Sequence, residues 1–337
     1  MVTKIFLTGA TGYIGGEALY SIHHAHPDFE FTLLVRNEQK ANLISAQYPD
    51  AKFVYGNLDD SKIIEEAAAA ADIVIHTADS SDNLPSARAI AKGLAEGHSD
   101  DKPGYWIHVS GTGMLEWYDI HNGRYGQSPL PEQKYHDIDD IDRILTIPHH
   151  APHRDCDEIV LAANEIGRVR TLIVCPPTIY GPGRGPVNQR SIQIHRMAKF
   201  TLENGFAPIM AGEGSPEWNS VHIHDLGAFF VLAVDAALDP EKQKNPEIFG
   251  PHGYFFLENG TYTWREAAGW VAEAAQKQGY LPEAKTQVGD YKYHGANSKG
   301  VAARAKKYLG WTPHGGSLRD EVPSIVAVEA KVLGKQA

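Results

Sequence analysis

Gly9-Ala-Thr-Gly12-Tyr-Ile-Gly15 is the stretch of sequence that decides the fold. It follows residues 2–7, a short apolar run that predicts a buried strand, and it leads into residues 14–24, whose apolar spacing predicts a helix. Glycine is needed where a chain turns sharply and where its backbone must approach a pyrophosphate closely. The N–H groups that open the helix offer donors and partial positive charge to phosphates. The stretch therefore predicts a dinucleotide-binding unit.

Outward from this stretch, apolar runs alternate with helical segments through about residue 180. We expect strands at residues 2–7, 29–35, 52–55, 72–76, 105–109 and 170–174, and helices at residues 14–24, 40–47, 61–71, 86–97 and 157–165. This alternation indicates right-handed crossovers and a parallel sheet. The predicted fold class is α/β, a doubly wound parallel Rossmann sheet with a smaller C-terminal α/β substrate lobe.

The alternation stops at the run Tyr180-Gly-Pro-Gly-Arg-Gly-Pro186, which predicts a loop. Further elements are expected at residues 192–204, 220–224, 225–237 (a helix with Asp225 as N-cap), 254–257, 263–278 and 301–309. The predicted coenzyme-binding domain comprises residues 1–183 and 220–250, and the predicted lobe comprises residues 184–219 and 251–337. The core of the lobe is expected to hold Tyr262, Trp264, Trp270 and Trp311.

The composition is that of a soluble globular protein. The chain has 337 residues, 42% of them apolar and 22% charged, and its formal net charge is 31 − 42 = −11. The acidic balance argues against nucleic acid as a partner, and no apolar run approaches the roughly 20 residues that cross a bilayer. The two cysteines, Cys156 and Cys175, make no disulfide framework. We expect a cytoplasmic monomer or homodimer that acts on a small molecule.

The choice of dinucleotide depends on the end of the second predicted strand. An acidic residue about 20 residues beyond the glycines would hold a ribose 2′-hydroxyl. Arg36 occupies that position, 21 residues after Gly15, and Lys40 follows one helical turn later. A guanidinium can form paired hydrogen bonds to a 2′-phosphate. NADP(H) is therefore predicted over NAD(H), which remains possible; the alternative is that Arg36 is a solvated surface charge.

Further segments lie at the ends of the later predicted strands. They are Gly56-Asn-Leu-Asp59, Ile75-His-Thr-Ala78, His108-Val-Ser110, Cys175-Pro-Pro-Thr-Ile-Tyr180-Gly181 and Val221-His-Ile-His-Asp225-Leu. Together with the glycines, this ordered set resembles the extended and atypical short-chain dehydrogenase/reductases, which carry the NAD-dependent epimerase/dehydratase domain. The resemblance covers about residues 1–235.

The resemblance implies where the coenzyme lies. Asn57 and Leu58 would flank the adenine, with Asn57 where the family often has Asp, and residues 176–179 would border the nicotinamide. Thr77 and Ala78 would line the ribose and pyrophosphate. The full expected set is Gly9, Thr11, Gly12, Tyr13, Ile14, Gly15, Arg36, Lys40, Asn57, Leu58, Thr77, Ala78, Pro176, Pro177, Thr178 and Ile179.

The family's catalytic pair is missing. That pair is a Tyr and a Lys four residues apart on one helix, assisted by a Ser or Thr that polarises the substrate oxygen. Ser110 and Thr112 are present. Counting back from residue 158 places His150 at the Tyr position and Arg154 at the Lys position; a shift of one residue gives His149 and His153 instead.

Three interpretations of this departure stay open. A histidine could donate the proton, because its pKa lies near neutrality, with Arg154 as a fixed cation. A tyrosine of the insert, Tyr118, Tyr125 or Tyr135, could replace the missing one. Alternatively, the protein binds NADP(H) without catalysis and acts as a redox sensor. The first hypothesis is an NADP(H)-dependent oxidoreductase acting on a small carbonyl-type substrate; the others are the sensor and, less favoured, an epimerase/dehydratase.

The remaining charged groups have simpler interpretations. The acidic run 137–142 is expected to be a solvated loop, and no metal site is expected although 17 histidines occur. His222 and His224 are expected on one face of a strand as packing residues. The arginines that could contact an anionic substrate, or lie at the surface, are Arg184, Arg190 and Arg196.

Overall fold

The computed structural model describes residues 2–209, 212, 214–289 and 295–336, and its centre is a seven-stranded sheet with the order β11-β7-β5-β4-β1-β2-β3. All six strand pairs are parallel. The strands are β1 (Lys4–Thr8), β2 (Glu30–Val35), β3 (Lys52–Tyr55), β4 (Ile73–His76), β5 (Gly104–Val109), β7 (Val169–Cys175) and β11 (Tyr254–Phe256). The strand order reverses between β1 and β4, which is where open α/β sheets bind ligands.

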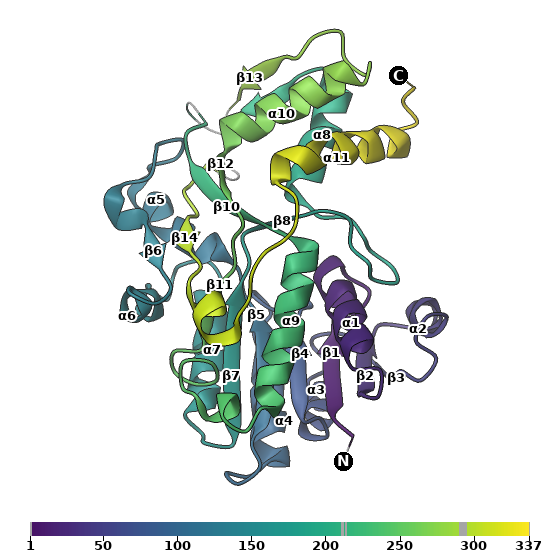
Figure 1. Ribbon diagram of the computed structural model, residues 1–337, viewed down its shortest axis with the longest axis vertical. Coiled ribbons are helices and arrows are strands. Elements are labelled where there is room, and N and C mark those ends of the chain that lie inside the picture. The colour runs from purple at the N-terminus through teal and green to yellow at the C-terminus, as the bar shows by residue number, and fades with distance from the viewer. Residues whose placement is uncertain (1, 210–211, 213, 290–294, 337) are drawn as a thin grey trace.

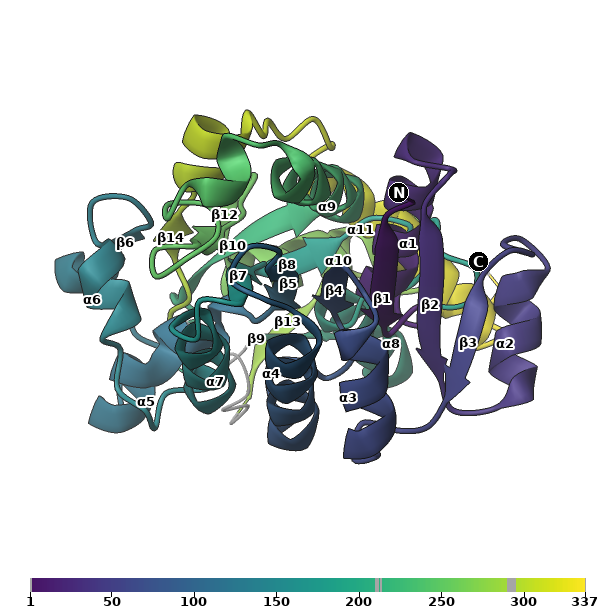
Figure 2. The ribbon, with the colours of Figure 1, turned by 90° about the horizontal axis from the view of Figure 1, so that it is seen from below.

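Helices cover both faces of this sheet (Figure 2). One face carries α3 (Ser61–Ala69), α4 (Leu84–Gly97) and α7 (Arg154–Asn164), and the other carries α1 (Tyr13–Ala25) and α9 (Ile223–Leu238). The strands are apolar on both sides because each side contributes to its own buried cluster. The predicted doubly wound Rossmann sheet is confirmed.

A smaller group of elements lies beyond the carboxyl ends of the strands, at the top of Figure 1. Its core joins three helices to the three-stranded sheet β12-β10-β8. These elements are α8 (Gln193–Asn204), α10 (Trp264–Lys277), α11 (Leu318–Val332), β8 (Thr178–Tyr180), β10 (Glu217–His222) and β12 (Thr261–Thr263), with the pair β9 (Ala207–Ile209) and β13 (Thr286–Val288) beside them.

Short elements complete the fold. They are α2 (Glu38–Ser45), α5 (Trp117–Asn122), α6 (Ile141–Leu145), β6 (Tyr135–His136), β14 (Gly300–Val301), three 3₁₀ turns at Thr112–Glu116, Pro131–Gln133 and Lys242–Lys244, and a π-helical turn at Ala305–Leu309. In the part of the chain that the structure describes, no helix has the length and apolar character needed to span a bilayer. Cys156 and Cys175 are both free and buried.

Two expectations about the tail are wrong. Residues 254–256 were expected in the smaller lobe, but β11 extends the large sheet beside β7. All three of its residues are buried although β11 is an edge strand, because their side chains enter the apolar clusters on both faces of the sheet. Trp311 likewise packs in the core of the large sheet, where its Nε1 donates to the Asp225 carbonyl. Tyr262 and Trp264 lie in the core of the lobe as expected, with Trp270 packed against it.

The expected cap of α9 is also wrong. His222 caps the helix, and its Nδ1 accepts from the backbone N–H of His224. His224 therefore belongs to the first helical turn rather than to a strand. The Asp225 carboxylate instead accepts backbone N–H groups of His314 and Gly315. Sequence could not show this, because the partner segment lies almost 90 residues away.

The acidic run 137–142 is not simply a solvated loop. Asp137 is fully buried, and its carboxylate accepts backbone N–H groups of Phe256, Ala303 and Arg304 at 3.3, 2.8 and 3.0 Å. The insert between β5 and α7 is thereby fixed to the chain that follows β14. The expectation failed at this position because only a distant segment supplies donors for the carboxylate.

Asp137→Ala is expected to lower the free energy of unfolding by at least about 3 kcal/mol. Each buried N–H donor left without an acceptor costs about 1–3 kcal/mol, and this change orphans three. Urea unfolding measures the loss. Asp142→Ala is the matched control, because that side chain is 94% exposed, and it should change stability by less than about 0.5 kcal/mol. Equal losses in the two variants would contradict the role assigned to Asp137.

Candidate active site

The glycine-rich turn between β1 and α1 is too tight for larger residues. Gly9 has φ +85°, which L side chains rarely adopt. A Cβ on Gly15 would lie 2.3 Å from the Gly9 carbonyl oxygen, so the backbone at these two positions is in direct contact. Gly12 caps α1 without a side chain and leaves the first N–H groups of the helix accessible. The turn therefore has the geometry of a diphosphate cradle.

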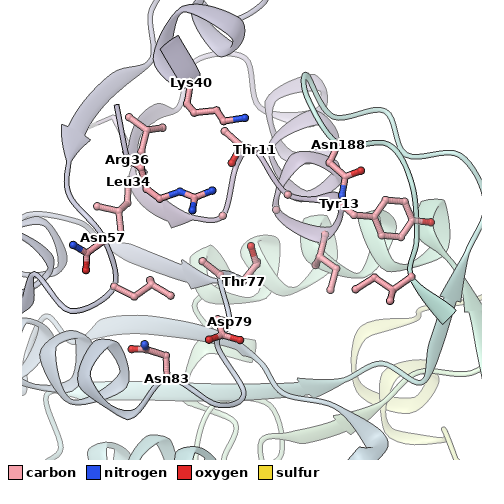
Figure 3. A pocket seen from close by; sticks show the side chains of 18 of the residues that line it. Thr11, Tyr13, Leu34, Arg36, Lys40, Asn57, Thr77, Asp79, Asn83 and Asn188 are labelled. Carbon is pink, nitrogen blue, oxygen red and sulfur yellow. The ribbon is translucent and has the colours of Figure 1, made fainter. Parts of the chain in front are cut away.

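A cavity of about 680 Å³ runs along this turn at the carboxyl ends of the strands. Its size suits a coenzyme. Fourteen of the sixteen coenzyme residues predicted from sequence line it; Pro176 and Thr178 do not. Thr178 is fully buried and shares a hydrogen bond of 2.7 Å with the Tyr262 hydroxyl, so its side chain faces the lobe core. The close-up in Figure 3 shows ten of the lining side chains by name.

Two cations stand at one end of this cavity. Figure 3 shows the Arg36 guanidinium pointing into the cavity, with Lys40 nearby. Among the residues that the structure describes, neither side chain has a hydrogen bond or an ion pair. Asn57 lies at the same end, where its side chain accepts the backbone N–H of Asp59. This end has unpaired positive charge available for an anion.

A loop after β8 closes the other end, and sequence reasoning missed its contribution. The Asn188 backbone N–H donates to the Thr11 carbonyl, and the Tyr13 hydroxyl donates to the Gly181 carbonyl. Arg184 is anchored by the buried Glu17. The lining residues that sequence reasoning missed come from two segments. Asp79 and Asn83 follow β4, whereas Asn188, Ser191, Ile192 and Gln193 follow β8. The glycine-proline run was the only sequence signal for this loop, and it carries no ligand signature.

The three candidate anion-binding arginines line neither this cavity nor the neighbouring one beside His153. Arg184 pairs with Glu17, and Arg190 pairs with the buried Glu329. Arg196 is exposed on α8. Within the described ranges no group of three or more potential ligands could hold a metal ion.

A second cavity, of about 520 Å³, adjoins the first and shares Pro177 and Gln193 with it. Its other described lining residues are Gly111, Thr112, Gly113, Glu116, Ile120, Tyr125, Pro152, His153, Pro176 and Trp218. Pro177 and Gln193 therefore mark the border between the two cavities, and Pro176 adjoins it in the second one. This border is where the resemblance places the nicotinamide, which makes the second cavity the candidate substrate pocket.

His153 is the only histidine, among the described residues, that lines this pocket. Its Nδ1 lies 2.8 Å from Asp82 Oδ1, and its Nε2 faces the turn at Gly113. Burial opposes charge on the ring, but the hydrogen bond and the negative charges of Asp82, Asp157 and Glu116 outweigh it and raise the pKa of His153. The hydrogen bond from His153 correspondingly lowers the pKa of Asp82. The pair suits a proton donor held in one orientation.

The other candidates for the missing pair lie outside the pocket. His149 is exposed and pairs with Glu158 at 2.7 Å, and His150 is exposed beside the His121 ring. Arg154 is buried and donates to the Leu145 carbonyl. Of the two alignments considered, the one-residue shift brings a histidine to the pocket. His153 has φ +68°, so its side chain does not point in the direction that a regular helix, counted back from residue 158, would give it.

The serine and threonine lie at different depths. Thr112 lines the pocket, and its Oγ1 and carbonyl accept from Ser298. Ser110 is buried beneath it and does not line the pocket. Of the insert tyrosines, Tyr125 lines the pocket, whereas the Tyr135 hydroxyl accepts from Trp117 inside the core. Tyr118 is not among the lining residues.

Beneath Ser110 lies a carboxyl group that sequence reasoning did not single out. Asp157 is fully buried on α7 and accepts a hydrogen bond of 2.5 Å from the Tyr254 hydroxyl. Burial raises the pKa of Asp157 to about 6, against which the Tyr254 hydrogen bond acts. His108 lies 4.0 Å away and is equally buried, and burial keeps its pKa well below the usual value, so it supplies no counter-charge.

This shift predicts that the free energy of unfolding falls as the pH rises from about 4 to about 6. The unfolded chain ionises Asp157 near its ordinary pKa of 3.8, whereas the folded chain ionises it near 6. The folded state therefore loses about 3 kcal/mol over this window, at about 1.4 kcal/mol per pH unit. Asp157→Asn removes the titrating group. The variant should therefore lose less stability than the parent when the pH is raised from 4.5 to 7.5. Urea unfolding at both values measures this; identical pH dependence in both proteins would refute it.

These features define a class of protein. A parallel Rossmann sheet, a glycine cradle at the point where the strand order reverses, and a long cavity ending in a second pocket define a protein that binds a nicotinamide dinucleotide. In agreement, a family model described as NAD(P)H-binding matches residues 9–118.

Comparison with known proteins identifies the family. The chain is 36% identical over 355 aligned residues to the oxidase ucsJ of Acremonium sp., covering 99% of both chains. It is 25% identical to an uncharacterized protein of Saccharomyces cerevisiae, covering 73% of both. The chain belongs to the extended and atypical short-chain dehydrogenase/reductases, a family of NAD(P)-dependent oxidoreductase-type enzymes with the Rossmann fold.

Solved structures agree on the fold. UDP-glucose 4-epimerase of Thermotoga maritima superposes with a TM-score of 0.68 at 15% identity, covering 98% of this chain and 100% of that one. The dTDP-glucose 4,6-dehydratase DesIV of Streptomyces venezuelae, solved with NAD bound, gives a TM-score of 0.69 at 16% identity, covering 98% of both chains.

Proposed function

We propose that the protein is an NADP(H)-dependent oxidoreductase that reduces a small substrate with a C=O or C=N bond, with His153 as the proton donor. The observation that carries the proposal is the position of His153. It lines the candidate substrate pocket, which adjoins the coenzyme cavity, and Asp82 holds its Nδ1. Because the carboxylate of Asp82 accepts from Nδ1, Nε2 remains to face the substrate.

The chemistry divides between coenzyme and protein. The bound nicotinamide supplies hydride to the electrophilic carbon. The His153 imidazolium donates a proton to the substrate oxygen as negative charge develops there, which is general acid catalysis. Thr112 at the pocket wall and the apolar side chains of Ile120 and Pro152 orient the substrate and exclude water. The histidine thereby replaces the hydroxyl of the family's tyrosine.

The preference for NADP(H) is part of the proposal. Its support is the Arg36 guanidinium, which points into the coenzyme cavity and has no partner in the described chain. Lys40 adds a second cation at the same end. Arg36 and Lys40 would hold the 2′-phosphate.

Consumption of NADPH across a panel of aldehydes, ketones and imines tests the function. Steady turnover of at least one compound, with NADH used less well, is the expected result. Tight NADPH binding without turnover of any compound would favour the redox sensor instead. Interconversion of nucleotide sugars without net consumption of coenzyme would favour an epimerase.

A further inference from the structure

The substrate pocket contains a carboxyl group without a partner of its own. Glu116 ends the 3₁₀ turn Thr112–Glu116 and lines the pocket. In the described part of the chain its carboxyl group makes no hydrogen bond and no ion pair. Its Oε1 lies 3.6 Å, and His153 Nε2 lies 2.7 Å, from the point that a Cβ on Gly113 would occupy. The carboxyl and the imidazole therefore face one small space above a glycine.

The charge of this carboxyl group is not balanced by the protein. The described lining residues of the pocket include no Lys and no Arg. His153 lines the pocket and acts on Glu116 as a positive charge, but it already pairs with Asp82 at 2.8 Å. Burial raises the pKa of Glu116 to about 8, although the charge of His153 acts against this. A buried carboxylate is costly unless a counter-charge reaches it.

The surroundings of Glu116 suit an organic cation. The aromatic residues Trp218 and Tyr125 line the pocket, together with apolar residues that include Ile120, Pro152 and Pro177. Aromatic faces attract cations, and apolar walls accept the hydrocarbon part of a small amine. The pocket thus combines one acidic group with aromatic and apolar residues, beside the polar side chains of Thr112 and Gln193.

We propose that the physiological substrate carries a positively charged nitrogen, as a protonated imine, and that Glu116 holds this nitrogen in the imine and in the amine that reduction forms. The inference rests on the proposed function and narrows its substrate class. In the reduction, the carbon of the C=N⁺ bond accepts hydride from the reduced nicotinamide coenzyme, and the π electron pair moves to nitrogen. The resulting neutral amine takes a proton from His153, and the coenzyme leaves oxidised.

Calorimetry with two ligands of matched shape tests the proposal. The protein is saturated with NADPH, so that neither cyclohexylamine, which is protonated at pH 7, nor cyclohexanol can react. We expect the ammonium ion to bind at least about tenfold more tightly than the alcohol, which is about 1.4 kcal/mol. Its binding should also release a proton from Glu116, seen as a binding enthalpy that differs between phosphate and Tris buffers.

Glu116→Gln isolates the charge. The amide can still donate a hydrogen bond, as a protonated carboxyl would, but it cannot balance a cation. The variant should lose the preference for the ammonium ion and the proton release while binding NADPH unchanged. Glu132→Gln, an exposed residue of the same insert, should behave as the parent.

Three results would overturn the inference: tighter binding of the alcohol, ammonium binding without proton release, or an unchanged preference in Glu116→Gln. These failures are distinguishable from failure of the proposed function. If neutral ketones are reduced while the ammonium ion is not preferred, the oxidoreductase stands and only the cationic substrate is wrong. If no compound of the panel causes NADPH to be consumed, the proposal of an oxidoreductase is itself wrong.

Discussion

His153→Asn is expected to lower kcat for reduction by about 10²–10⁴-fold, the usual contribution of a general acid. Asparagine suits the test because it tolerates the left-handed backbone that His153 adopts, with φ +68°. The fold and the coenzyme cavity should remain intact, so NADPH affinity should change little. The proton donor is lost because an amide has no proton to give near neutral pH.

The matched control is His150→Asn. This residue is only three positions away, and it occupies the tyrosine position in the unshifted alignment, but its ring is exposed beside His121. We expect kcat within about twofold of the parent. Loss of activity in His150→Asn with retention in His153→Asn would reverse the assignment of the proton donor.

The pH dependence gives an independent measure. Because the pKa of His153 is raised by Asp82, the parent should keep its activity at and above pH 6.5 and lose it as the pH rises through that higher pKa. Asp82→Asn removes the hydrogen-bonding carboxylate, so the falling limb of kcat/KM should move to lower pH. An unchanged limb in Asp82→Asn would show that another group controls proton transfer.

Local patterns were enough to predict the Rossmann sheet and the glycine cradle. The spacing of apolar residues and the positions of Gly9, Gly12 and Gly15 are local properties of the sequence. Each predicted element can therefore be identified without knowledge of distant contacts. The failures involve distant partners. The sequence around Asp137 predicts a surface residue, but residues 303–304 supply hydrogen-bond donors to its carboxylate. The sequence around β11 predicts a strand of the lobe, but this strand pairs with β7.

For the same reason, sequence could predict the end of the coenzyme cavity at Arg36 but not the end that the loop after β8 closes. Arg36 lies directly after a strand of the βαβ unit, at a fixed distance from the glycines. Asn188 and Ser191 reach the cavity through a loop whose path depends on contacts such as that between Arg184 and Glu17. His153 enters the pocket through one residue of left-handed backbone, which no helical count includes.

Arg36→Asp is expected to weaken NADPH binding by about 10²–10³-fold. A hydrogen bond to a charged group contributes about 1.5–3 kcal/mol, and a tenfold change in affinity corresponds to 1.4 kcal/mol. The substitution removes the guanidinium and places a carboxylate where the 2′-phosphate would lie, so repulsion adds to the loss. NADH lacks this phosphate, and the new carboxylate can accept its ribose hydroxyl. NADH affinity should therefore stay the same or rise, and the coenzyme preference should reverse.

Calorimetric titration of both coenzymes into parent and variant measures the preference directly. Arg168→Asp provides the matched charge reversal, because Arg168 directly precedes β7 and lies at the amino ends of the strands, whereas the coenzyme cavity lies at their carboxyl ends; its side chain is 52% exposed. It should leave the NADPH/NADH ratio unchanged, apart from a weak effect on net charge that salt suppresses. Lys40→Ala should give an intermediate loss confined to NADPH, because a point charge contributes less than a guanidinium fork. Should Arg36→Asp bind NADPH as the parent does, the guanidinium is a solvated surface charge and the coenzyme preference must come from elsewhere in the cavity.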